Sequence, residues 1–300
     1  MDYKICVMVC VRDRPTELSL LLQSLRSQTY KNFIVYVLDD CSGTLLSNYH
    51  FLACVVNKMN MEGNFIRFFR NDFNLGVSKS RQKLVDLALK TDCDLLMRVD
   101  DDVILEPDYI EKLLKVIESG YDLASGVTPF MGQAQFKRES RFAQPIINRV
   151  ILDKEGTFIH NGDDCGLEYH DESIIPMHHF RSCALYKREI HESGITYDSR
   201  LTKHGFREEE ILSFKIITEG FKMACNTKAV AWHLMTPSGG ERFADSQELV
   251  HINEMVLKDF TKQIYIEKGD FIEEYNRKLN INPPSLTEEL FKQTNLIMPI

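Results

Sequence analysis

Short apolar runs alternate with helical patterns through the first half of the chain, and this alternation limits the fold more than any other feature. Five runs rich in apolar and β-branched residues predict strands, at residues 4–11, 33–40, 64–70, 94–100 and 121–127. Helical patterns lie between them, at residues 15–28, 76–90 and 106–119. Strands that are apolar on both faces and alternate with helices are typical of a mainly parallel sheet covered on two sides. The sequence therefore predicts an α/β fold with a Rossmann-like first half.

The second half of the chain is less regular. An irregular stretch begins near residue 128, and it contains one predicted strand or hairpin at residues 146–153. Regular patterns return at residue 179 and continue to a predicted strand at 228–234. From residue 236 onward we expect a loop that contains proline and glycine, followed by a helical extension.

The charge and the cysteine pattern exclude several classes of protein. The 300-residue chain has a formal net charge of −8, which argues against sequence-independent nucleic-acid binding and against an electrostatic membrane anchor. No apolar stretch is long enough to span a membrane, and the first residues have the pattern of a strand rather than of a signal peptide. The eight cysteines include no CxxC pair, so we expect reduced thiols and a cytoplasmic location.

Charged residues follow three of the predicted strands. Arg12 and Asp13 follow the first strand, Asp39 and Asp40 end the second, and the acidic triplet 100–102 ends the strand at 94–100. In a parallel sheet, ligands bind beyond the carboxyl ends of the strands, so these clusters are expected to converge on one site. Carboxylates in an Asp-x-Asp arrangement on a turn suit a hard divalent cation, and the alternative is a solvated acidic turn.

Several motifs, in this order, carry a family resemblance. They are the opening RDRPTELSLLLQSLRSQTY, then YVLDDCS, NLGVSKSRQ, RVDDDVILEPDYI, FRSCALYKREI and GFREEEILSFKIITEGF. The chain resembles the family 2 glycosyltransferases, which have the GT-A fold, over roughly residues 4–235. The resemblance implies a catalytic domain at 1–235, with a nucleotide-sugar-binding half at 1–127 and an acceptor half at 128–235. A lid loop and helical extension at 236–300 would follow.

The resemblance also implies a nucleotide-sugar donor, with UDP favoured, and a bound Mn²⁺ or Mg²⁺. It places the metal on Asp100, Asp102 and His233, the alternative for His233 being a packed core residue. The residues that it implies for donor binding are Arg12, Asp13, Asp39, Asp40, Asn74, Gly76, Arg81, Asp100 and Asp101. For Asp101 a solvated carboxylate is the alternative, and Gln82 departs from the asparagine that the family usually has.

By the same resemblance, Glu209 occupies the position of the general base. A base there would remove the acceptor proton on the face opposite the diphosphate, which implies inversion at the anomeric carbon. The family usually has aspartate here, and the alternative is a first-turn carboxylate stabilised by the helix dipole. The segment 236–242 is expected to act as a lid, with Arg242 toward the phosphates, or to be an ordinary linker.

Two other functions compete with this interpretation. A nucleotidyltransferase would share the nucleotide-binding half, but the loop after the first strand, VRDRPTE, lacks the glycines typical of that class. A non-catalytic protein of the same fold would be expected to lose the acidic triplet or the glutamate pair. The acceptor is left open among a glycan, a metabolite, a lipid-linked sugar, a protein and a modified base, and the oligomeric state is also open.

Overall fold

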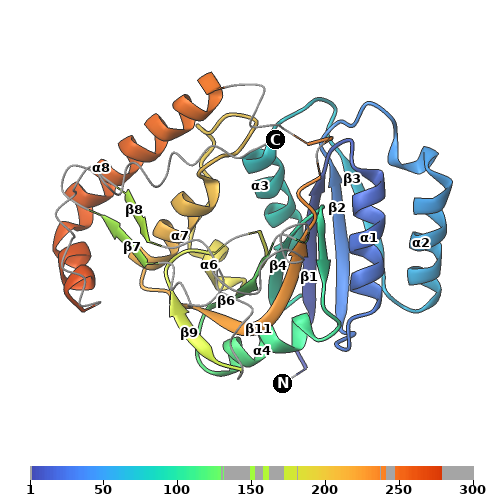
Figure 1. Ribbon diagram of the computed structural model, residues 1–300, viewed down its shortest axis with the longest axis horizontal. Coiled ribbons are helices and arrows are strands. Elements are labelled where there is room, and N and C mark those ends of the chain that lie inside the picture. Colours follow the sequence, from blue (N-terminus) through green and yellow to red (C-terminus); the bar gives the residue numbers. More distant parts are fainter. Residues whose placement is uncertain are drawn as a thin grey trace.

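The computed structural model describes residues 2–129, 131, 149–152, 158–161, 172–180, 182–236, 238–240 and 247–278. These residues form a nine-stranded sheet, a separate two-stranded hairpin, and helices that cover both faces of the large sheet (Figure 1). The elements in the first half of the chain are β1 (Ile5–Val11), α1 (Pro15–Arg26), β2 (Phe33–Asp39), η1 (Leu46–Asn48), α2 (His50–Met61), β3 (Ile66–Arg70), α3 (Val77–Ala88), β4 (Leu95–Asp100), β5 (Val103–Leu105), α4 (Tyr109–Glu118) and β6 (Leu123–Val127). Those that follow are β7 (Arg149–Leu152), β8 (Phe158–Asn161), β9 (Ile174–Met177), β10 (Ala184–Lys187), α6 (Glu189–Glu192), α7 (Glu208–Thr218), β11 (Met223–His233) and α8 (Gln247–Lys278).

The first four strands of the large sheet are parallel, as the alternating pattern predicts. The order across the sheet is β3-β2-β1-β4-β10-β6-β11-β5, with β9 also paired to β11. The register places Val11 beside Asp39 and Cys10 beside Asp100, so β1, β2 and β4 end at the same level. The residues that follow these strands therefore lie along one edge of the sheet.

Strand alternation sends the β1 side chains into two cores. Ile5, Val7 and Val9 pack in the core that includes α1, α2 and α4, whereas Cys6 and Met8 pack in the core on the opposite face, with α3 and α7. Figure 1 shows α1 and α2 on one side of the sheet and α3 on the other. Because both faces are covered, the parallel strands are apolar at almost every position.

The second half enters the same sheet with mixed directions. Strand β10 is antiparallel to both β4 and β6, and β11 is parallel to β6 but antiparallel to β5 and β9. These pairings place the end of β11 directly beside the turn that joins β4 to β5, where Leu234 N donates to Asp102 O at 2.9 Å. The site is therefore built where the two halves meet.

Helix α8 lies outside the sheet and packs on α7. Leu257, Phe260 and Ile264 form a third apolar cluster with Ile211 and Phe214 of α7. Lys268 has non-helical dihedral angles, which mark a kink inside α8. No helix among the described residues is long and apolar enough to cross a bilayer.

Most of the predicted elements are present, and the differences have local causes. The predicted strand or hairpin at 146–153 is present as strand β7, and its partner β8 lies beyond the predicted range. Helix α2 escapes prediction because its start carries no proline, no acidic first turn and no side-chain cap. Strands β5 and β9 are only three and four residues long, too short for a periodic signal. Residues 279–300 of the predicted helical extension lie outside the described residues.

Candidate active site

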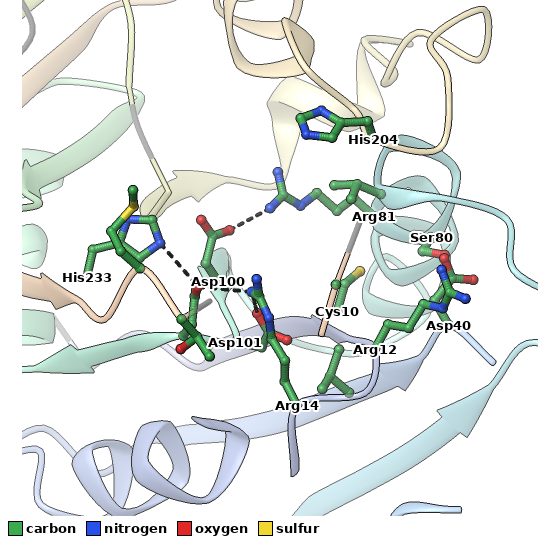
Figure 2. A pocket seen from close by; sticks show the side chains of 16 residues that line it. Cys10, Arg12, Arg14, Asp40, Ser80, Arg81, Asp100, Asp101, His204 and His233 are labelled. Carbon is green, nitrogen blue, oxygen red and sulfur yellow. Dashed lines mark hydrogen bonds and ion pairs between the residues drawn. The ribbon is translucent and has the colours of Figure 1, made fainter. Parts of the chain in front are cut away.

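A pocket of about 410 Å³ opens at the common carboxyl ends of β1, β2 and β4. Seven of the predicted site residues line it, and they come from both halves of the chain (Figure 2). They are Arg12, Asp40, Arg81, Asp100, Asp101, Asp102 and His233. Asp13, Asp39, Asn74, Gly76 and Glu209 do not line the pocket, and their contacts are described below.

The tight turn after β4 aims the acidic triplet toward the end of β11. Val103 of β5 pairs with His233 of β11, and this pairing brings His233 Nε2 to 3.1 Å from Asp102 Oδ1. Ligand atoms of Asp100, Asp102 and His233 all lie within 4.8 Å of one another. Two residues on one strand end and one residue about 130 positions later therefore meet in a single cluster.

Arg14 supplies a built-in cation beside this cluster. Its Nη1 donates to Asp101 Oδ1 at 3.0 Å and to Asp102 Oδ2 at 2.9 Å. Burial raises the pKa of Asp101 to about 7, although the positive charge of Arg14 opposes the shift. Asp101 is therefore neither a solvated carboxylate nor directed away from the site, because it is buried and shares Arg14 with Asp102.

The Asp102–His233 pair favours the charged form of both partners. Burial acts to raise the pKa of Asp102, but the hydrogen bond and charge of His233, together with Arg14, outweigh burial and lower it. Burial also acts to lower the pKa of His233, and the hydrogen bond and negative charge of Asp102 outweigh it in the opposite direction. Each residue therefore acts as a counter-ion for the other.

The donor set of this cluster fits a divalent cation. Carboxylate oxygens suit Mg²⁺ and Mn²⁺, and imidazole is the commonest metal ligand among side chains. The Asp102 oxygen that faces His233 and the imidazole nitrogen come from adjacent strands, so the turn backbone fixes both. The residues present are thus compatible with the predicted metal on Asp100, Asp102 and His233.

Arg81 links the acidic triplet to the start of α7. From α3, its Nη2 donates to Asp100 Oδ1 at 2.5 Å, as Figure 2 shows, and its Nη1 contacts Glu208. Glu208 Oε1 also lies 2.9 Å from Nη2 of Arg98, while the next residue, Glu209, contacts the same nitrogen. Glu209, the predicted general base, is therefore linked to Asp100 through Arg98, although Glu209 does not line the pocket.

The two aspartates at the end of β2 face different partners. Asp39 accepts from Ser42 N at 2.8 Å and from Arg70, and it lines a separate apolar groove beside α2. Asp40 lines the pocket at the strand ends and accepts from Asn71 Nδ2 at 2.8 Å. Both carboxylates are predicted to bind the donor, but only Asp40 reaches the pocket.

Asp40 also shapes the turn into α3. Its carboxylate accepts from Leu75 N at 2.9 Å and from Gly76 N at 2.8 Å, and Asn74 Oδ1 accepts from Gly76 N at 3.0 Å. Gly76 has a φ of +86°, and a Cβ atom there would lie 2.4 Å from Lys203 Cα. Asn74 and Gly76 thus act on the turn and on its contact with the second half.

The loop after β11 closes over the loop after β1. Gly240 N donates to Arg12 O at 2.9 Å, and Arg14 Nε donates to Ser238 O at 3.3 Å. A Cβ atom at Gly239 would lie 2.5 Å from Asp13 O, so only glycine fits there. Asp13 itself ties down its own side of the site, where its Oδ1 accepts from Gly43 N at 2.7 Å. Arg242, expected toward the phosphates, lies outside the described residues.

Sequence analysis assigned no role to three residues that the site contains, although one of them, Arg14, belongs to the charged cluster that follows the first strand. Arg14 sits at the start of α1, Arg98 lies two positions before Asp100, and His204 lines the pocket above Arg81. Because strand side chains two positions apart share a face, Arg98 could have been placed beside Asp100 from the sequence. No comparable spacing signal marks His204, which reaches the pocket through the long excursion between α6 and α7.

Comparison with known proteins agrees with this architecture. The sequence model of glycosyl transferase family 2 matches residues 6–194. An uncharacterized glycosyltransferase of Haemophilus influenzae is 34% identical over 110 residues, which amount to 35% of this chain and 32% of that protein. The chain thus matches about a third of the length of this relative.

Two solved structures are similar in fold. The structure of S. aureus TarS 1-349 in complex with UDP-GlcNAc has a TM-score of 0.56 and 14% identity, and the match covers 84% of this chain and 65% of TarS 1-349. The structure of GalNAc-T7 with UDP, GalNAc and Mn²⁺ has a TM-score of 0.59 and 15% identity, and the match covers 84% of this chain and 48% of that one.

The mixed sheet, which has a pocket at its strand ends, is that of the GT-A fold. Within that fold class, the chain belongs to glycosyl transferase family 2, because the family model covers more than half of its residues. The predicted fold and the predicted family are both confirmed.

Proposed function

We propose that this protein is a metal-dependent glycosyltransferase that moves a sugar from a UDP-sugar to an acceptor hydroxyl, with inversion at the anomeric carbon. The observation that carries the proposal is the convergence of Asp100, Asp102 and His233 at the edge of a family 2 fold. The UDP-GlcNAc bound to TarS and the UDP, GalNAc and Mn²⁺ bound to GalNAc-T7 support a UDP-sugar donor and Mn²⁺ or Mg²⁺.

The residues of the pocket suit the parts of such a donor. Asp40 has one donor on Oδ2 and so keeps acceptor capacity for a pyrimidine ring N–H. Arg12, which lines the pocket, and Asp13, which follows it outside the lining, are proposed to lie beside the nucleoside. Asp100, Asp102 and His233 would hold the metal, which neutralises the charge on the departing diphosphate. Arg81 keeps the Asp100 side chain directed into the pocket.

Glu209 is proposed as the general base. A carboxylate that takes the acceptor proton during attack contributes about 10²–10⁴ in rate. Glu209 lies in the first turn of α7, on the same face of the sheet as Asp100, to which Arg98 connects it. Attack on the face away from the diphosphate gives the inverted product.

The halves of the chain would then divide the work. We assign donor binding mainly to 1–127 and acceptor binding mainly to 128–235, with 236–300 as lid loop and helical extension. The seven described cysteines are free thiols, which supports the proposal of a reducing, cytoplasmic setting. The acceptor is a glycan, a metabolite, a lipid-linked sugar, a protein or a modified base.

Calorimetry with nucleotide sugars tests the proposal. Wild type is expected to bind a UDP-sugar only with Mn²⁺ or Mg²⁺ present and to hydrolyse it slowly without an acceptor. The D102A variant should lose metal-dependent donor binding, whereas E209Q should bind donor but turn over about 10²–10⁴-fold more slowly. Asp259, exposed on α8, provides the control D259N, which should behave as wild type.

Two results would overturn the proposal. One is that no UDP-sugar binds at millimolar concentration with either metal. The other is that E209Q keeps full turnover, which would show that Glu209 is not the general base. The metal assignment would then still be tested by D102A.

A further inference from the structure

Arg98 is a fully buried charge in the centre of the sheet. It lies on β4 between Met97 and Val99, and only 3% of it is exposed. Arginine is rarely buried unless its charge is paired, and burial without pairing is costly. The position therefore needs a reason beyond packing.

The contacts of Arg98 converge on one nitrogen. Its Nη2 contacts Glu209 Oε1, lies 2.9 Å from Glu208 Oε1 and 3.7 Å from Asp100 Oδ1. Its Nε and Nη1 are buried without a hydrogen-bond partner among the described residues, and the guanidinium lies 5.3 Å from the centre of the Phe180 ring. Burial of unpaired donors costs free energy, and two of the three guanidinium nitrogens lack a partner among the described residues. The contacts of Nη2 are therefore the ones that account for the position of Arg98.

Glu209 is held by one oxygen only. Oε1 accepts from Arg98 Nη2 and from Ser182 N, the second at 2.8 Å. No contact to Oε2 is found within the described part of the chain, and 22% of the side chain is exposed. The carboxylate is therefore anchored at one oxygen while the other is left for an outside group.

The neighbouring glutamates are in different environments. Glu208 has a 7% exposed side chain and serves as counter-ion to both Arg81 and Arg98. Glu210 pairs with Arg207 at 2.8 Å, away from Arg98. Glu208 Oε2 also lacks a hydrogen-bond partner among the described residues, but this atom is buried. Of these three consecutive carboxylates, Glu209 has the most exposed side chain, at 22% against 7% for Glu208 and 13% for Glu210.

The charges around Arg98 do not cancel. Arg81 and Arg98 carry two positive charges, while Asp100, Glu208 and Glu209 carry three negative ones. Arg98 attracts all three of these carboxylates, so only part of its attraction acts on Glu209. Arg98 therefore holds Glu209 in place while it also pairs with Asp100 and Glu208.

We propose that Arg98 is a positioning residue for glycosyl transfer: it fixes Glu209 through Oε1 and directs Oε2 toward the acceptor hydroxyl. The inference rests on the proposed function of Glu209 as general base. Arg98 acts through Glu209 and touches neither donor nor acceptor. Its link to Asp100 also keeps the base in a fixed relation to the donor side of the site.

Steady-state kinetics of R98M test the role. Displacement of a catalytic group by about 1 Å costs about 10²-fold in rate. We expect kcat to fall about 100-fold, with the donor KM within about threefold of wild type. R98K, which keeps the charge but loses the planar fork, should fall between R98M and wild type.

Two further variants separate positioning from charge balance. R98M/E208Q removes one positive and one negative charge, so it should regain much of the thermal stability that R98M loses while kcat stays low. The control is R188M, because Arg188 donates to the main-chain oxygens of Leu89, Thr91 and Cys93. R188M should lose stability but keep the kcat and the donor KM of wild type.

Unchanged kcat in R98M, or full recovery of kcat in R98M/E208Q, would overturn the role of Arg98 even if wild type binds and transfers sugar as proposed. A wild type that binds no UDP-sugar would instead overturn the proposed function. In that case the Tm values of R98M, E209Q and their double variant still test the contact. A double variant that loses less than the sum of the single losses supports the anchoring, and strict additivity overturns it.

Discussion

The two halves of the molecule build the same site by different means. In residues 2–127, the site side chains follow parallel strands whose ends are level, so strand order alone brings Arg12, Asp40 and Asp102 to one edge. In the second half, Glu209 arrives on the first turn of α7, and His233 arrives on a strand end through the antiparallel pairing of β11 with β5. In the first half, the repeated strand–helix pattern positions the site side chains. In the second half, the packing of separate elements positions them.

This difference has an electrostatic counterpart. On the first-half side, Arg14 shares its charge between Asp101 and Asp102 at hydrogen-bond distance. Across the boundary, Arg98 and Arg81 join β4 and α3 to the glutamates of α7. Arginines therefore serve as the connecting groups both within the acidic turn and between the halves.

The largest expected effect concerns the contact between the halves at Gly76. G76A should cost about 1–3 kcal/mol for the unfavourable backbone and about 1–3 kcal/mol more for the clash with Lys203. Gly63 offers a matched control, because it has a φ of +88° but nothing within 4 Å of a Cβ atom. Urea unfolding should show a clearly larger loss for G76A than for G63A. Equal losses would mean that the contact at Lys203 is not tight.

The next effect tests whether the second half completes the metal site. Loss of a residue that supports a metal ligand costs roughly 10- to 100-fold in metal affinity. H233A removes a proposed ligand itself, so Mn²⁺ binding should weaken by at least this factor. The measurement is Mn²⁺ titration followed by calorimetry, without donor. The control is H251A, at an exposed position on α8. An unchanged Mn²⁺ affinity in H233A would confine the metal to the first half.

A smaller effect is expected at Arg14, within the first half. R14Q removes the cation shared by Asp101 and Asp102, so the apoprotein should lose about 1–3 kcal/mol of stability. Mn²⁺ should then raise Tm more in R14Q than in wild type, because it supplies the missing positive charge. R26Q, which breaks the surface pair with Glu62, is the control and should leave the Mn²⁺-induced shift unchanged. A smaller shift in R14Q than in wild type would contradict this role.

The smallest effect concerns the surface of the second half. Arg207 Nη2 lies 2.7 Å from Glu254 of α8, whose side chain is 41% exposed. E254Q should cost about 0.2–1 kcal/mol in urea unfolding, as exposed ion pairs do. Donor affinity should not change. A loss of donor binding would show that α8 contributes to the site.

The sequence predicts the first half well because its signals are local. Each strand there is a buried run that ends in charged residues, so the position of Asp100 and Asp102 at a shared edge follows from the order of elements. The pairing of β11 with β5 depends on the short strand 103–105, which has no periodic signal of its own. His233 could therefore be proposed from the family resemblance but not from spacing.

Residue Arg98 shows where prediction stops. Its place on the same strand face as Asp100 follows from the period of two, but its partner on α7 does not. The contact with Glu209 joins residues that are 111 positions apart and depends on how α7 packs against the sheet. Ion pairs of this range are set by packing, for which the chain carries no local signature.

The close fit between Gly76 and Lys203 has a consequence for how such proteins can diversify. Val77 N also donates to Lys203 O at 3.0 Å, so the backbone of a distant loop packs directly behind a residue that lines the pocket. A chimera that inherited residues 2–127 from a cousin would set a foreign turn against this loop, where a single methyl group does not fit. Exchange of the turn at Gly76 between relatives must therefore carry the segment around Lys203 with it.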